Sequence, residues 1–213
     1  MRLLPFAALA ALSCATLNCL AGEIYGGAGS TGLEIGLTQN FAQRFAGRFE
    51  LNTLNFSRQF NTSNIDYDAK LKFSTAGAYV DYFLGNSFRV TGGALLGSRK
   101  IHGSARSVGN TIRINGVTYP VVAGDSLDFD AKFPNAAPYI GIGWGHQAQS
   151  AGLHFYADAG VAFGQPDVIL TPSASLASKI NPADLAAEQN SAQDKANSLR
   201  NYPVLKFGLR WTY

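Results

Sequence analysis

The closing segment of the chain, residues 203–213, constrains the fold more than any other part of the sequence. Its side chains alternate between apolar ones and small or charged ones, with cations at Lys206 and Arg210. Successive side chains of a β-strand point to opposite faces, so the segment predicts a strand with one apolar and one cationic face. A soluble sandwich could hide such a face against a second sheet, so a soluble protein and a membrane protein both stay open. The apolar face holds Pro203, Leu205, Phe207, Leu209, Trp211 and Tyr213.

The N-terminus has the pattern of a secretory signal peptide. Met1-Arg2 precedes an apolar run from Leu3 to Leu12, and small residues then lead to Ala21. This order predicts a signal peptide over residues 1–21, with cleavage after Ala21 or after Gly22. The apolar run is too short to cross a bilayer as a helix, which takes about 20 residues. A buried N-terminal helix is the alternative.

Both cysteines, Cys14 and Cys19, fall inside the predicted signal peptide. The mature chain would then contain neither a disulfide nor a cysteine-based metal site. A lipoprotein modified at Cys14 is an alternative, although the residues before Cys14 match a lipidation motif only in part.

Beyond residue 22 no apolar run is long enough for a transmembrane helix. Backbone polar groups in lipid must bond to one another, so a membrane protein of this sequence would have to be a β-barrel. Barrel strands show as segments of about ten residues with alternating hydrophobicity. Eight such segments lie near residues 24–30, 32–39, 45–52, 65–82, 88–96, 140–145, 153–164 and 203–213.

Two places in this pattern allow more than one interpretation. A tight turn near Ser30-Thr31 separates the first two strands, but residues 24–39 could instead form one long strand. In the segment 65–82 the alternation changes parity between Ser74 and Ala76, which predicts a β-bulge.

The connections alternate between short and long ones. Outer-membrane barrels have short periplasmic turns and longer external loops. Residues 22–213 therefore predict one closed, antiparallel, eight-stranded transmembrane β-barrel, with external loops at about 103–128 and 164–201. The first loop holds a hairpin over 111–122, because Asn115-Gly116 favours a type I′ turn. The second holds a loosely attached helix over 181–200, rich in Ala, Leu, Glu, Gln and Lys. The short turns lie near 40–44, 85–87 and 147–152, with a modest external one at 59–64.

The chain resembles the superfamily of small eight-stranded outer-membrane barrels that includes the OmpA transmembrane domain, OmpX and OmpW. The signal peptide, the Gly-rich opening Ile24–Gly29 and the closing segment Leu205–Tyr213 carry this resemblance. It implies the outer membrane of a Gram-negative bacterium, with outer-membrane lipid and lipopolysaccharide as surroundings. It also implies periplasmic chaperones and the barrel-assembly machinery as partners during biogenesis. The assembly signal would be Phe207, Leu209, Trp211 and Tyr213, where a terminal Phe is the commoner form.

Charged side chains on the inward faces predict a charge network in the lumen. An eight-stranded barrel is only wide enough for side chains to fill it, and an unpaired charge there is costly. We therefore expect paired charges that plug the barrel, with glycines leaving room for long side chains; a selective or gated pore is the alternative. The predicted network is Arg48, Glu50, Lys72, Asp81, Arg89, Asp158, Lys206 and Arg210.

Aromatic residues gather near the predicted periplasmic ends of the strands. Aromatic rings with a polar edge favour the membrane interface, so these residues predict an aromatic girdle. Ordinary core packing, which a soluble β-sandwich would also show, is the alternative. The girdle would contain Tyr25, Tyr82, Phe88, Trp144 and Trp211.

The sequence predicts neither an enzyme nor a cofactor or metal site. A net charge of +3 with scattered basic residues gives no patch for nucleic acid. His146 and His154 flank one turn, which favours interfacial histidines over a metal site. His102 and Ser104 near the external rim suggest a lipid-modifying enzyme only weakly, with Asp125 and Asp128 in the same loop. We expect a structural or surface-interaction role through the external loops; the alternative is a narrow porin-like channel.

Overall fold

Eight antiparallel strands close into a ring in the computed structural model, which describes residues 22–62, 65–85, 87–107, 111–146 and 151–213. The last strand pairs with both the first strand and the one before it, so the ring has no open edge. The predicted eight-stranded barrel is confirmed, whereas the predicted signal peptide and both cysteines lie outside the described residues. The ring strands are β1 (Gly22–Gly29), β2 (Gly32–Ala42), β3 (Phe45–Thr62), β4 (Ile65–Phe83), β5 (Phe88–Ser107), β9 (Ala136–Trp144), β10 (Gly152–Phe163) and β12 (Asn201–Thr212).

The turn near Ser30-Thr31 separates β1 from β2, so the alternative of one long strand over 24–39 is wrong. The two strands pair from Gly22 with Gln39 up to Gly29 with Gly32. Gly32 has a φ of +99°, and a Cβ there would lie 2.0 Å from the carbonyl oxygen of Thr53. Glycine alone fits this corner without strain.

The predicted β-bulge between Ser74 and Ala76 is wrong. β4 keeps one unbroken register with β3 from Ile65 to Tyr82 and with β5 from Ile65 to Phe83. Its odd-numbered side chains from Phe73 to Phe83 are buried throughout. The alternation in the sequence changes because the surroundings of the strand change. The outward side chains of β4 are apolar within the closed ring and are lysines where the strand extends beyond it. Lys72 is therefore exposed on the outer face and does not belong to the lumen.

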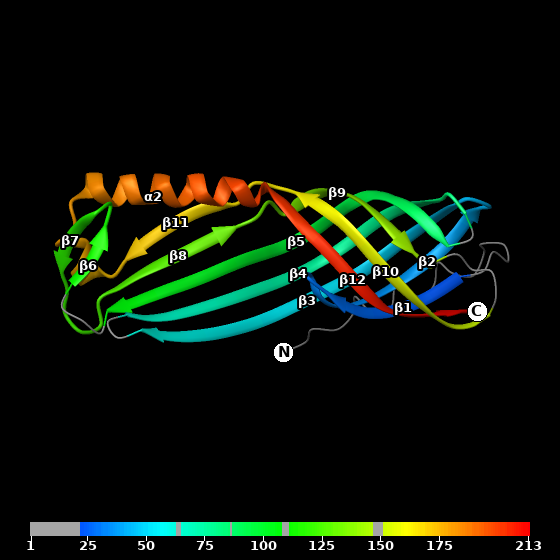
Figure 1. Ribbon diagram of the computed structural model, residues 1–213, viewed down its shortest axis with the longest axis horizontal. Helices are drawn as coiled ribbons and strands as arrows, with labels where there is room; N and C mark the ends of the chain where they lie inside the picture. The colour runs from blue at the N-terminus through cyan, green and yellow to red at the C-terminus, as the bar shows by residue number, and fades with distance from the viewer. Residues whose placement is uncertain (1–21, 63–64, 86, 108–110, 147–150) are drawn as a thin grey trace, which may run out of the picture.

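Three strands of the ring are far longer than one membrane crossing requires. β3, β4 and β5 contain 18, 19 and 20 residues, whereas a tilted crossing strand needs about 9–11. β5 continues to Ser107 through the start of the predicted loop at 103. Beside it, β8 (Ser126–Lys132) and β11 (Asp167–Pro172) widen the sheet. These strands project together to the left of the closed ring (Figure 1).

The part of the molecule that extends beyond the closed ring, which we call the external part after the predicted external loops, carries a hairpin and a helix. The hairpin consists of β6 (Thr111–Ile114) and β7 (Val117–Pro120). Positive φ values of 49° at Asn115 and 78° at Gly116 confirm the predicted type I′ turn. The helical segments are α1 (Ala174–Ala177), α2 (Pro182–Asn197) and the short η1 (Ser198–Arg200).

Helix α2 lies firmly against the widened sheet, contrary to the expected loose attachment (Figure 1). Ala196 packs with Ala131 of β8 and Val168 of β11. The side chain of Gln193 accepts a hydrogen bond from the Val168 amide at 2.9 Å and donates one to the Pro166 carbonyl at 2.9 Å. Tertiary contacts, rather than a broad apolar face, therefore hold the helix.

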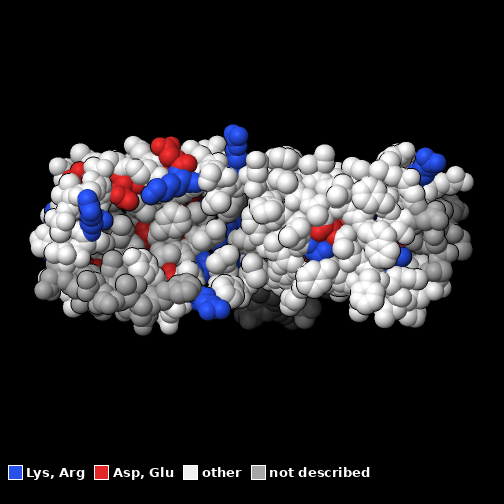
Figure 2. Space-filling model, in the orientation of Figure 1, with Lys and Arg blue, Asp and Glu red and all other residues white. Residues whose placement is uncertain are grey.

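The closed ring displays an apolar band on its outside. In Figure 2 the visible charged atoms gather over the external part on the left, and the ring on the right is mostly uncharged. An outward apolar band of this kind is typical of barrels that face lipid. Among the described residues, no helix is long and apolar enough to cross a membrane. Exposed side chains of the band include Leu33, Ile35, Leu37, Phe49, Leu51, Val80, Leu96, Ile140, Ile142, Phe155, Leu205, Phe207 and Leu209.

Candidate functional site

Two arginines and two aspartates form the centre of the lumen. Arg48 reaches Asp81 at 3.1 Å and Asp158 at 2.7 Å. Arg89 contacts the other oxygen of Asp158 and lies 3.4 Å from Asp81. The four groups come from β3, β4, β5 and β10, so their pairing ties opposite walls of the barrel together. Thr91 adds a hydrogen bond of 2.6 Å to Asp81.

A second set of charges surrounds Lys206 on β12. Its ammonium group contacts Glu50 and lies 3.1 Å from Glu34. The hydroxyl of Tyr79 donates to Glu50 at 2.8 Å, and that of Tyr25 donates to it at 3.1 Å. Sequence reasoning missed Glu34. It lies on the other face of the alternating strand 32–39 from Ile35, so the alternation already indicated that it points into the lumen.

A third set lies around Arg210, at the end of the lumen farthest from the external part. Arg210 pairs with Glu23, whose other oxygen lies 3.0 Å from the Nδ1 atom of His146. His146 is fully buried and packs its ring 4.6 Å from Tyr25 and 4.5 Å from Tyr156. The expectation of an interfacial His146 is therefore wrong, because the chain after β9 turns inward. Glu23 precedes the first alternating segment and was missed.

Small residues make the space that these long side chains occupy. A Cβ on Gly143 would lie 2.1 Å from an oxygen of Asp158 and 2.7 Å from the guanidinium carbon of Arg89. The glycine therefore leaves room for the central charge set, as the sequence led us to expect. Crowding of this kind is typical of small barrels whose lumen is occupied by side chains.

Apolar and tyrosine side chains cross the lumen on the external side of the charges. Their positions along the strands place them beyond Asp81, Arg89, Asp158 and Lys206. We call this set the apolar layer. It consists of Tyr79, Leu95, Ala137, Tyr139, Ala162 and Val204, all buried.

Arg99 lies beyond the apolar layer, and sequence reasoning missed it. It is buried, donates a 2.8 Å hydrogen bond to the Pro134 carbonyl, and stands 5.6 Å from the ring centre of Phe133. These contacts cap the external mouth of the ring with a cation held against aromatic rings.

Three of the five rings predicted for an aromatic girdle are exposed, Tyr25 is buried and so wrongly assigned, and a girdle at a membrane interface stays a prediction. Phe88, Trp144 and Trp211 are exposed at the ends of β5, β9 and β12 that lie away from the hairpin and α2. Tyr82 is half-buried and packs against Phe45, with ring centres 5.0 Å apart. Tyr25 instead faces the lumen. The sequence did not show to which face it belongs, because the glycines that follow it in β1 interrupt the alternation of apolar and polar residues.

The residues of the predicted assembly signal all point outward from the last strand. Phe207, Leu209, Trp211 and Tyr213 are exposed, whereas Arg210 between them and Lys206 directly before them are buried. Recognition of these residues by an assembly machinery stays a prediction.

The residues considered for lipid chemistry do not form one site. Ser104 donates to Asp128 at 2.6 Å, while His102 pairs separately with Asp130 at 3.0 Å. Asp125 binds Lys179 at 3.1 Å. A hydrogen bond from the Val122 amide lowers the pKa of Asp125. Nucleophilic catalysis needs a base bonded to the hydroxyl, and this arrangement pairs the hydroxyl with a carboxylate instead.

Within the described ranges, no three side chains of the metal-binding types lie close enough to hold a metal ion.

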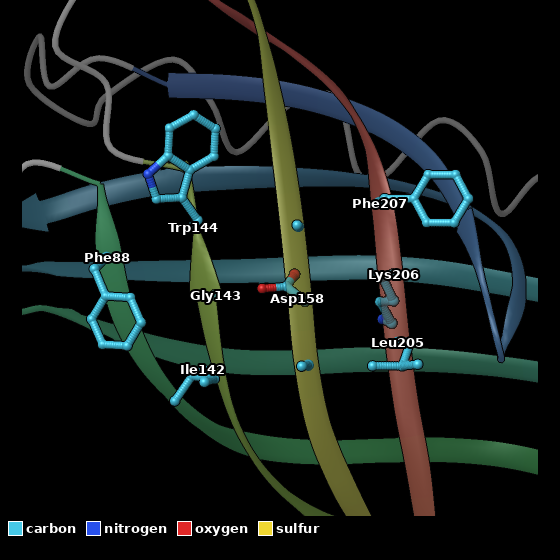
Figure 3. Close-up of a pocket in the computed structure, with 10 residues that line it drawn as sticks. Phe88, Ile142, Gly143, Trp144, Asp158, Leu205, Lys206 and Phe207 are labelled. Atoms are coloured by element: carbon cyan, nitrogen blue, oxygen red, sulfur yellow. The ribbon is translucent and has the colours of Figure 1, made fainter.

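A shallow groove of about 430 Å³ runs over the outside of β9, β10 and β12. Ile142 and Trp144 stand on one side of it and Leu205 and Phe207 on the other (Figure 3). Its floor is made of small residues of β9 and β10, and its lining is almost wholly apolar.

Comparisons with known proteins agree with this geometry. No family model matches the sequence, and no curated protein matches it. The structure is similar to that of CarO2 from Acinetobacter baumannii, with a TM-score of 0.66 and 17% sequence identity over 91% of this chain and 99% of that one. It is also similar to CarO from Acinetobacter baumannii, with a TM-score of 0.61 and 15% identity over 90% of this chain and 97% of that one. The chain thus has the fold of the small eight-stranded outer-membrane β-barrels.

Proposed function

We propose that the protein resides in the outer membrane and acts there as a structural or surface-interaction protein through its external part. The observation that carries this proposal is the combination of a filled lumen with an elaborate external part. Paired charges and the apolar layer lie across the lumen, which supports a plugged barrel over a channel for solutes. In contrast, the hairpin and α2 build a defined external surface.

The contact between the hairpin and α2 supports a preformed external surface. Glu188 accepts a hydrogen bond from the Asn115 amide at 2.7 Å. Asp184 accepts one from the Asn115 side chain at 2.9 Å and another from the Tyr119 hydroxyl. A surface that is ordered before binding loses less conformational entropy when a partner docks.

The proposal includes the steps that bring the protein to the outer membrane. Residues 1–21 would direct export and be removed. The outward residues of the last strand would then serve as the assembly signal, read by the barrel-assembly machinery after delivery by periplasmic chaperones. We propose no catalytic activity, because the hydroxyl and imidazole at the external rim are paired apart.

Labelling of whole cells tests the orientation. Residues 22–213 contain no cysteine, so single cysteines can be introduced without competing thiols. Asn115→Cys in the hairpin turn should react with a membrane-impermeant maleimide on intact cells. The matched control, Arg44→Cys in the short turn between β2 and β3, should react only after the cells are lysed. Labelling of Arg44→Cys on intact cells, or release of the protein by osmotic shock, would refute the proposal.

A further inference from the structure

Three lysines lie side by side on the outer face of the sheet. Lys72 of β4 is the register partner of Lys100 of β5, and Lys100 is the register partner of Lys132 of β8. All three side chains are exposed. We call them the lysine row. Like charges directly opposite one another on neighbouring strands destabilise a sheet, so this arrangement is costly without a counter-charge.

The next rows of the same strands carry their own counter-charges. One register step further out, His102 of β5 pairs with Asp130 of β8 at 3.0 Å. Two residues beyond, Ser104 bonds to Asp128 at 2.6 Å. In the described part of the chain, no carboxylate lies within ion-pair distance of the lysine row. Asp167 of β11 is the exposed register partner of Lys132, so the row ends beside one carboxylate. Lys72 and Lys100 have no acidic register partner, because Lys72 lies between Asn55 and Lys100, and Lys100 lies between Lys72 and Lys132. The strand β8 thus offers carboxylates in the outer rows and a lysine in the innermost one.

The lysine row sits at the height of lipid headgroups. The last outward apolar residue of β5 is Leu96, four residues before Lys100. A rise of about 3.3 Å per residue and a tilt of about 45° put the Lys100 backbone about 9 Å above the apolar band. Long lysine side chains can bend toward the bilayer surface from that height.

We propose that the lysine row binds the phosphate groups of phosphorylated glycolipid in the outer leaflet. An ammonium group offers three donors, and a phosphate offers several acceptor oxygens, so two or three lysines can share one headgroup. The row extends over three adjacent strands, spaced about 4.8 Å apart, which gives it the width of a phosphorylated sugar. The inference rests on the proposed outer-membrane location.

The test measures lipid binding to the folded barrel in detergent. The probe is lipid A carrying its phosphates, compared with lipid A from which the phosphates have been removed. The variant is Lys72→Gln/Lys100→Gln/Lys132→Gln. Its charge-matched control is Arg113→Gln/Lys179→Gln/Lys195→Gln, which removes one cation each from the hairpin, the turn between α1 and α2, and α2. A lysine near an anionic lipid surface contributes about fivefold in affinity, so the variant should bind phosphorylated lipid A on the order of 100-fold more weakly.

Three further results are expected. The control variant should bind phosphorylated lipid A as tightly as the parent protein does. Lipid A without phosphates should bind equally to the parent and to the lysine variant, and millimolar inorganic phosphate should not displace phosphorylated lipid A. Equal affinity of variant and parent would overturn the inference, and so would displacement by inorganic phosphate, which would indicate a site for the free ion. If the protein does not reside in the outer membrane, the whole-cell labelling will show it. The lipid binding measured in detergent can still be interpreted in that case.

Discussion

The replacement of Arg89 by methionine tests the lumenal charge network most sharply. Arg89 is fully buried, contacts Asp158, lies 3.4 Å from Asp81, and donates a 2.8 Å hydrogen bond to the Gly145 carbonyl. In Arg89→Met the two aspartates share only Arg48, which leaves one buried negative charge without compensation. Breaking a buried ion pair by removing one partner costs about 3–5 kcal/mol. We expect the free energy of unfolding to fall by that amount.

A second variant separates lost charge balance from lost packing. Arg89→Met/Asp158→Asn removes one charge of each sign, so Arg48 and Asp81 remain as a balanced pair. We expect the double variant to be more stable than Arg89→Met by about 1 kcal/mol or more, since groups in one network are coupled. Lys72→Met is the control: its side chain is exposed, so its effect should stay within about 0.5 kcal/mol.

Urea unfolding of the barrel in lipid vesicles gives these free energies. The fluorescence of Trp144 and Trp211, the two tryptophans of the chain, reports the transition because both lie on the lipid-facing surface. A loss below about 1 kcal/mol in Arg89→Met would refute the charge network as a stabilising element. A double variant less stable than Arg89→Met would show that packing, rather than charge balance, controls the site.

Two further predictions concern the crowded lumen and the external part. Gly143→Val should prevent assembly of a heat-modifiable barrel, because its Cβ would lie 2.1 Å from Asp158, whereas Gly92→Ala should assemble normally, since nothing lies within 4 Å of the added carbon. Hydrogen bonds from Tyr119 and Asn115 lower the pKa of Asp184. Their contribution to the stability of the contact between the hairpin and α2 is therefore complete above the ordinary aspartate pKa, and it is lost as the pH falls through the lowered pKa of Asp184. The amide resonances of the hairpin should follow this loss in an NMR titration, and Tyr119→Phe should move the midpoint to higher pH; an unchanged midpoint would contradict the assignment.

The strand count could be predicted from the sequence because lipid and lumen impose opposite polarity on alternate residues. The segment from Leu205 to Tyr213 shows this in every residue pair. The same reasoning failed where the surroundings changed along a strand. On β4 the outward side chains change from apolar to polar near Ser74. A rule that assigns every polar position to the lumen therefore places Lys72 on the wrong face. The alternation of apolar and polar residues shows what surrounds each face of a strand. Which face points into the lumen must be decided at one position and then kept along the whole strand.

The predicted charge network was incomplete for a different reason. Glu23 precedes the first alternating segment. Glu34 lies on the polar face of an alternating strand, but its neighbours on that face, Gly36 and Thr38, carry no charge. His146 enters the lumen from the chain beyond β9, where no strand pattern exists. The extension by β8 and β11 depends on pairing between segments far apart in the sequence, which local hydrophobicity does not encode.

A closed lumen is the central claim, and conductance measures it directly. The purified barrel, shown to be folded by its shift on gels with and without boiling, would be inserted into planar lipid bilayers beside a channel-forming porin as positive control. The paired charges and the apolar layer across the lumen predict no current steps above the bare bilayer. Reproducible unitary steps in molar salt would contradict the account and identify the protein as a narrow channel.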